Sequence, residues 1–232
     1  MHFTAPILFL VARDAYKRIT PTAPSSAGGR HDALVSIVFS VASLEAFFNE
    51  LSEFLADPPE LFNQLPPEII DMINGLRTIE SDKGSVGQKF KLAFEKLSGH
   101  VCDKGASPYQ DLSLLIAVRN GLVHMKPDKF SGEAEGGGIL AMGPSPLIIA
   151  RLRAKGVLAD AEMPFPVNHD AGIQTMVLFP LPWHHQVSTC KAAEWACNTA
   201  AEVVNNILAI FPDIPPHRHN LMTTYSRFQR VN

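Results

Sequence analysis

The chain has 232 residues, of which 46% are hydrophobic and 19% charged, and its formal net charge is -3. This composition is typical of one soluble globular domain or a domain plus an insert, and it excludes collagen-like, disordered and disulfide-scaffold proteins. The slightly negative charge argues against a broad basic face, so any nucleic-acid partner must be bound locally. Three cysteines are few and odd in number, which favours a reducing, cytoplasmic compartment.

Two apolar stretches are candidates for a signal peptide or a membrane-spanning helix. The run from Ala5 to Ala12 lacks a preceding basic residue, which is unlike a signal peptide. The longest uncharged apolar stretch, 33–44, has 12 residues, whereas crossing a bilayer takes roughly 18 to 20. We therefore expect no membrane-spanning helix.

The first long helix is predicted to follow a linker. Residues 21–29 are rich in proline, glycine and hydroxyl side chains, so 1–29 are expected to form an N-terminal segment and linker. Beyond Arg30, apolar residues recur at spacings of three and four, and Asp57-Pro58-Pro59 ends the pattern. These residues are Ile37, Val41, Leu44, Phe48, Leu51 and Leu55.

A second helical region is predicted to open at Leu65-Pro66-Pro67, to break around 82–85 and to close at Ser98-Gly99. A third helix is expected to follow, with Ser107 as N-cap, Pro108 in its first turn and Gln110 completing a capping box.

The stretch 125–187 differs in composition, because it holds seven of the 18 prolines and seven of the 15 glycines. We interpret it as an insert with one helix, over 147–162, and an ambiguous short strand over 173–179. After it a last helix is predicted from another apolar stripe, which Pro212 ends. The stripe consists of Ala193, Ala196, Ala200, Val203, Ile207 and Ile210.

These patterns predict an all-α fold. The expected architecture is an antiparallel bundle of four to five helices, formed by 30–124 and 188–212. An irregular insert, 125–187, precedes the last helix, and a basic segment, 213–232, follows it. That segment is predicted to be a solvated tail or, alternatively, to contact phosphate.

Two charged residues stand where apolar ones are expected. Arg119 shares a predicted face with Leu112 and Ile116, and Glu45 lies at the edge of the first helix's apolar stripe. Burying either charge alone is costly, so we expect the two to be partners. One interpretation of the pair is a purely structural ion pair between helices.

The segment Arg119–His124, RNGLVH, resembles the R-X4-6-H motif of the HEPN superfamily. In an unbroken helix, residues five apart point about 140° from each other, so a bend or helix end at Gly121 is expected to bring them together. Helix 36–51 is similar to the S-x-E-x-x-x-N-E helix of several HEPN families, and 190–204 is similar to their closing helix. The matching residues of 36–51 are Ser43, Glu45, Asn49 and Glu50.

This resemblance implies a metal-independent endoribonuclease that cleaves RNA by 2′-OH attack, leaving a 2′,3′-cyclic phosphate and a 5′-hydroxyl. The residue chemistry fits, because Arg119 can hold two phosphate oxygens and His124 can act as base or acid near neutral pH. Asn120 is expected to orient substrate or histidine, and Glu45 and Asn49 to hold Arg119. No cofactor is implied.

The resemblance also implies a homodimer, in which two motifs line one composite cleft and supply both proton-transfer groups. Lys126 and Lys129 would extend this basic, RNA-binding patch. The family context suggests a toxin, a stress or phage-defence effector, with an antitoxin or regulatory protein as a possible partner. The alternative function is a catalytically silent HEPN-like module for RNA binding or dimerisation.

The remaining candidate site residues are interpreted as structural. The histidine and cysteine pairs match no zinc signature, so no metal site is expected. Cys190 and Cys197 are predicted to be small core residues, Trp195 to be packed, and Gly136-Gly137-Gly138 to be a flexible turn. The pairs considered are His184-His185, His217-x-His219 and His100-x-Cys102.

Overall fold

A computed structural model describes residues 3–19, 27–57, 62, 64–124, 146–158, 162–168, 174–180, 183–215 and 217–232. The described chain is a helical bundle, which confirms the predicted all-α class, with one small β-ribbon added. Its elements are α1 (Ala5–Arg18), α2 (Ala27–Leu55), α4 (Pro67–Ser81), α5 (Val86–Ser98), α6 (Tyr109–Val123), α7 (Pro146–Ala154), β1 (Glu162–Asn168), β2 (Gln174–Pro180), α8 (Trp183–Gln186), α9 (Cys190–Ile210) and α10 (His217–Thr224).

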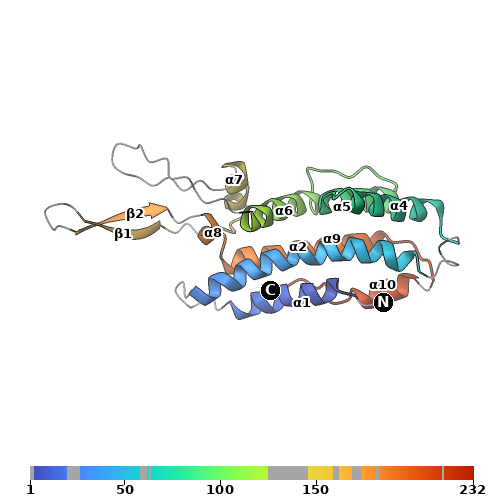
Figure 1. The fold of residues 1–232 in the computed structure, drawn as a ribbon, viewed down its shortest axis with the longest axis horizontal. Helices are drawn as coiled ribbons and strands as arrows, with labels where there is room; N and C mark the ends of the chain where they lie inside the picture. The colour runs from blue at the N-terminus through green and yellow to red at the C-terminus, as the bar shows by residue number, and fades with distance from the viewer. Residues whose placement is uncertain are drawn as a thin grey trace.

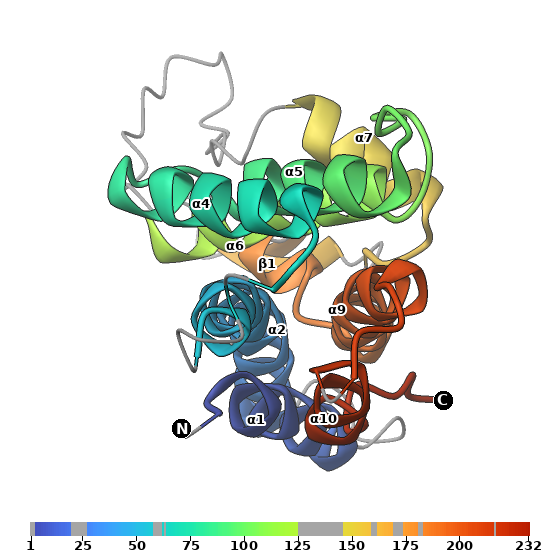
Figure 2. The same ribbon diagram turned by 90° about the vertical axis from the view of Figure 1, so that its right-hand side faces the viewer.

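The helices form three layers. Figures 1 and 2 show α2 and α9 in the middle layer, α4, α5 and α6 on one side of it, and α1 and α10 on the other. The middle layer therefore packs against both outer layers, and α2 contacts α1, α4, α5, α6 and α9.

The apolar stripe predicted for α2 is confirmed, because all six of its residues are at most 1% exposed. By length and composition the stretch His31–Leu55 is apolar enough to cross a membrane, and half of its most apolar 18 residues are buried inside the fold. Core helices of soluble proteins share that property, and in this fold the stripe packs against neighbouring helices.

Most helix ends lie where the sequence predicts them. Gly99 ends α5 in the left-handed region at φ 70°, which glycine adopts without steric cost. The predicted capping box at Ser107 is wrong, since its hydroxyl donates to Asp111 and Glu202 instead of accepting from the helix. A capping box is found at α5, where Ser85 and Gln88 bond each other's backbone N–H groups.

Helices α2 and α9 do not run antiparallel to each other. Ser36 of α2 contacts Cys197 of α9 at 3.2 Å and Ala193 O at 3.4 Å, and Ser40 contacts Cys197 at 3.9 Å. Contacts that ascend together along both helices mean that α2 and α9 run parallel. The chain reverses direction at α4, α5 and α6, so α6 ends and α9 begins at the end of the bundle where α2 begins (Figure 1).

The two chain ends pack into the fold: the N-terminal segment forms α1, and the burial of apolar residues in 213–232 corrects the interpretation of that segment as a solvated tail. The Glu50 carboxylate accepts hydrogen bonds from Ala5 N–H at 2.9 Å and Tyr225 Oη at 3.1 Å, so it joins α1 to the C-terminal segment. Phe228 is buried and stacks on Phe9, with ring centroids 4.4 Å apart. Apolar burial outweighs the basic character of this segment.

The insert is more ordered than predicted where the structure describes it. Leu152 and Val157 are buried in a core cluster with Trp183, and Val157 O accepts from Thr189 Oγ1 at 2.8 Å. The predicted helix 147–162 ends at Ala154, since Gly156 turns the chain with a φ of 66°. The predicted strand 173–179 corresponds to β2, which pairs antiparallel with β1.

The packing of the C-terminal segment predicts its contribution to stability. Phe228→Ala is expected to lower the free energy of unfolding by about 3 to 5 kcal/mol, because it empties a filled site in the core. Urea denaturation measures this, with Arg230→Ala, at an exposed position of the same segment, as the control. Equal, small effects of both substitutions would contradict the packing described.

Candidate functional site

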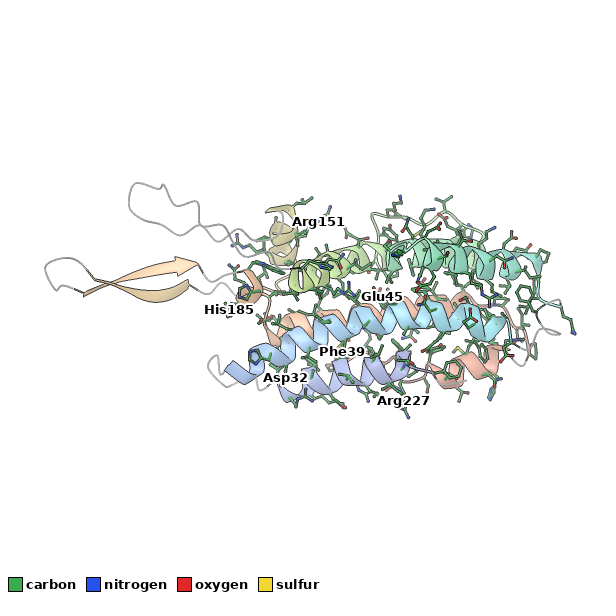
Figure 3. The ribbon with its side chains drawn as sticks, viewed as in Figure 1. Asp32, Phe39, Glu45, Arg151, His185 and Arg227 are labelled. Carbon is green, nitrogen blue, oxygen red and sulfur yellow. The ribbon has the colours of Figure 1, made fainter. Side chains whose placement is uncertain are left out.

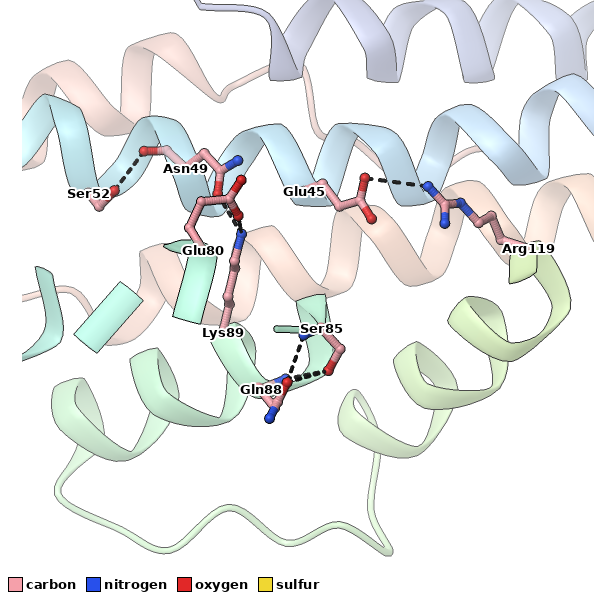
Figure 4. Close-up of polar contacts among 8 residues, drawn as sticks. All are labelled: Glu45, Asn49, Ser52, Glu80, Ser85, Gln88, Lys89 and Arg119. Carbon is pink, nitrogen blue, oxygen red and sulfur yellow. Dashed lines mark hydrogen bonds and ion pairs between the residues drawn. The ribbon is translucent and has the colours of Figure 1, made fainter. Parts of the chain in front are cut away.

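The predicted partnership of Glu45 and Arg119 is present. Arg119 Nη2 lies 3.5 Å from Glu45 Oε2, joining α6 to α2 across the layer boundary (Figure 4). The side chain of Glu45 is 43% exposed and that of Arg119 is 25% exposed. Figure 3 shows Glu45 on the side of α2 that faces α6. The pair thus lies at the rim of the core, within reach of solvent.

The predicted register of Arg119 needs correction. The buried face of α6 is rotated about the helix axis relative to the predicted one. Arg119 therefore borders the core instead of occupying it. Its partial exposure follows from this position, and Val123, one turn further along the same face, is 51% exposed. The buried residues of α6 are Leu112, Leu114, Leu115, Val118 and Leu122.

Arg119 is also held by its sequence neighbour. Its Nη1 donates to Asn120 Oδ1 at 3.0 Å, so the guanidinium has a carboxylate on one side and an amide oxygen on the other. Its Nε is buried and has no hydrogen-bond partner in the described part of the chain, so the exposed part of the guanidinium is at its Nη groups.

His124 ends the helix that carries Arg119. Helix α6 runs through Gly121 to Val123, so the helix does not end at Gly121 as predicted but at the histidine itself. The His124 backbone N–H donates to Asn120 O at 3.0 Å, and the residue is exposed. Because this is still a helical hydrogen bond, the backbone of His124 keeps the helical offset of about 140° from Arg119.

Asn49 does not hold Arg119 as predicted. Its Oδ1 accepts from Lys89 Nζ at 2.6 Å, and the same ammonium is paired with Glu80 (Figure 4). Lys89 is buried, so these two acceptors satisfy a charge that would otherwise be costly to bury. Asn49 thus fixes α5 and α4 against α2.

Lys89 was missed by the sequence analysis, although a signal for it existed. It lies three residues after Val86 and four before Ala93, which are both buried, so the helical period places it on the buried face of α5. The other polar residues of the HEPN-like helix have structural contacts: Ser43 Oγ donates to Ser40 O at 2.7 Å, and Glu50 forms the contacts described above.

A second missed residue, Asp111, connects α6 to α7 and α9. It is paired with Lys155, accepts from Ser107 Oγ at 2.9 Å and accepts from Trp195 Nε1 at 3.3 Å. Burial raises the pKa of Asp111, but the hydrogen bonds from these partners outweigh it and hold the pKa below its usual value. Asp111 therefore acts as an ionised anchor for the insert, and Trp195 is engaged there as a packed residue.

The histidine pairs do not converge. His184 and His185 have ring centroids 4.3 Å apart on α8, and Figure 3 shows His185 at the end of the bundle from which the ribbon projects. His217 lies on α10 at the opposite end, buried against Phe54, and burial lowers the pKa of its imidazole. Within the described ranges, His, Cys, Asp and Glu form no group of three that could hold a metal.

The predictions for the remaining residues have mixed outcomes. Cys197 is a buried core residue, as expected, and burial raises the pKa of its thiol, whereas Cys190 is partly exposed. The predicted RNA-binding residues Lys126 and Lys129, and the glycine run 136–138, lie outside the described residues.

Comparison with protein-family models, curated proteins and solved structures finds no match for this chain. The HEPN interpretation therefore continues to rest on the residues of the chain itself.

The exposure of the Glu45–Arg119 pair predicts a small contribution to folding. In a double-mutant cycle with Glu45→Ala and Arg119→Ala, we expect a coupling energy of roughly 0.2 to 1 kcal/mol, because solvent screens the attraction. Urea denaturation of the four proteins measures it. A coupling above about 2 kcal/mol would mean instead that the pair is chiefly a structural link.

The Lys89–Glu80 pair predicts a pH dependence. The hydrogen bond from Lys89 lowers the pKa of Glu80 in the folded state, so the pair stabilises the fold above the unfolded-state pKa of about 4.3. This stability is lost as the pH falls through the folded-state pKa. Glu80→Gln should flatten the acid side of a stability–pH curve, whereas Glu68→Gln, on the same helix, should leave it unchanged; identical curves for both would contradict the assignment.

Proposed function

We propose that this chain is a metal-independent endoribonuclease, with Arg119 and His124 as its catalytic residues. One observation carries the proposal: Arg119 is held by Glu45 and Asn120, yet its side chain remains a quarter exposed. A guanidinium has five N–H donors, so one that is positioned by two contacts and open to solvent can still bind the oxygens of a phosphodiester. The resemblance of RNGLVH to the HEPN motif assigns the same two residues.

The proposed reaction is an internal transfer. A base removes the proton of the ribose 2′-OH, and the 2′ oxygen attacks the adjacent phosphorus. The bond from phosphorus to the 5′ oxygen breaks, and an acid supplies the proton that this leaving group takes. Arg119 stabilises the added negative charge on the phosphoryl oxygens, and His124, exposed at the end of α6, serves as base or acid.

One histidine supplies one of the two proton transfers. The proposal therefore includes a homodimer, in which a second copy of His124 faces the same cleft and Lys126 and Lys129 add positive charge. RNA is the proposed partner, together with an antitoxin or regulatory protein if the chain is a toxin, stress or phage-defence effector. We place it in the cytoplasm, where its three unpaired cysteines are stable as thiols.

The competing function is a catalytically silent module that binds RNA or dimerises. The observation that favours it is the ion pair itself, because Glu45 and Arg119 also make sense as a structural contact between α2 and α6. The two functions differ in whether the His124 side chain is required for activity.

The test is cleavage of total RNA and tRNA in the presence of a chelator, with the product ends mapped. The wild-type chain should leave cyclic phosphate and 5′-hydroxyl ends, and His124→Ala and Arg119→Ala should each lose at least about 100-fold in rate. Glu45→Gln should reduce the rate less, because Asn120 still holds the guanidinium.

His100→Ala, at an exposed histidine beyond α5, is the matched control and should cleave as the wild type does. Circular dichroism checks that every variant is folded. Undiminished cleavage by His124→Ala would remove the mechanism, and no cleavage by folded wild-type protein would favour the silent module.

A further inference from the structure

The ribbon formed by β1 and β2 stands apart from the helical layers. Figure 1 shows it projecting from the end of the bundle beyond α8. The strands pair antiparallel over seven residues each, from Glu162 opposite Pro180 to Asn168 opposite Gln174. A lone two-stranded ribbon is marginally stable in water, and further strands or a packed helix are needed to stabilise it.

The prolines of the ribbon fix which backbone groups face inward. In an antiparallel pair, alternate residues exchange N–H···O=C bonds with the partner strand, and the residues between them point their N–H and C=O outward. The three prolines, Pro164, Pro166 and Pro180, all fall at even-numbered positions of the register. Because proline has no N–H, a complete ladder uses the odd-numbered positions and leaves the prolines pointing outward.

The two outer edges consequently differ. The outer edge of β1 lacks donors at Pro164 and Pro166, so another strand cannot pair along it. The outer edge of β2 keeps the N–H groups of Gln174, Met176 and Leu178. Among the strands that the structure describes, none pairs with this edge.

We propose that β2 pairs antiparallel with β2 of a second copy of the chain, about a twofold axis at Met176. Met176 then pairs with Met176, and Gln174 of each copy pairs with Leu178 of the other. All three donors and three acceptors of each edge are used, and Pro180 donates none of them. No residue of β2 is charged, so no like charges meet across the axis.

The same proline pattern explains why strand pairing through the ribbon would stop at two copies. The resulting sheet has the order β1, β2, β2, β1, and proline blocks both of its outer edges. A self-complementary contact about a twofold axis closes on itself. This proposal rests on the backbone of the ribbon alone, and it concerns a contact between copies other than the composite cleft of the nuclease proposal.

Disulfide trapping tests the register. The Cα atoms of a hydrogen-bonded antiparallel pair are about 5.5 Å apart, within the range that a disulfide spans. Oxidised Met176→Cys should therefore run as a covalent dimer on a non-reducing gel. Leu178→Cys is the matched control, because its two copies would lie roughly 13 Å apart along the strands.

Wild-type protein, with its three native cysteines, shows the background. No covalent dimer of Met176→Cys, or equal trapping of Leu178→Cys, would overturn the proposed register.

Sedimentation equilibrium tests the pairing without a cross-link. Met176→Pro removes the central donor of the open edge on both copies, so the dimer dissociation constant should rise at least about tenfold. Met176→Ala keeps the N–H group and should remain dimeric, and circular dichroism should show unchanged helix in both. A monomeric wild type, or a Met176→Pro dimer of undiminished strength, would overturn the proposal.

Discussion

Helix α2 is buried along one apolar stripe and contacts five other helices, so the polar side chains next to that stripe need partners from those neighbours. Each partner comes from a different place. Glu45 is paired from α6, Asn49 binds the lysine of α5, and Glu50 joins α1 to the C-terminal segment. These three contacts, within six residues of one helix, fix how the outer layers sit on the middle one.

The three contacts differ in burial, and this difference separates structure from function. The ammonium bound by Asn49 is buried and has two acceptors, as expected of a contact that holds helices together. The Glu45–Arg119 pair is partly open to solvent, so the guanidinium is positioned without being enclosed. An exposed pair contributes little to stability, so the value of this one lies in positioning Arg119 beside the end of α6.

Much of this fold follows from the sequence, because helical periodicity and proline placement are local signals. The stripes of α2 and α9, and the pairing of Glu45 with Arg119, can be predicted from spacing alone. Asn49 could not be assigned to Lys89, because that contact spans 40 residues and depends on the α4–α5 hairpin packing across α2. The burial of the C-terminal segment was missed for the same reason. Its apolar residues are few and stand among basic ones, and they are buried only because they pack against α1 and α2.

The parallel direction of α2 and α9 likewise follows from the reversals of the chain at α4, α5 and α6, which come between them in the sequence, and no local pattern reports that these two helices pack side by side. The same holds for the ribbon. Its strands are short, and their apolar pattern does not show which residue of one strand lies opposite which residue of the other. In both cases the missing information is which distant segments meet, and the helix-by-helix signal does not carry it.

The central claim is that Arg119 and His124 act together on an RNA phosphate. Its most direct test is an NMR titration that follows the Arg119 Nε–H and His124 imidazole signals as an RNA oligonucleotide with 2′-O-methyl groups, which cannot be cleaved, is added. The account predicts that both signals shift along one saturating curve, and that Glu45→Gln weakens the response of Arg119. Signals that stay unmoved at saturating RNA would contradict it.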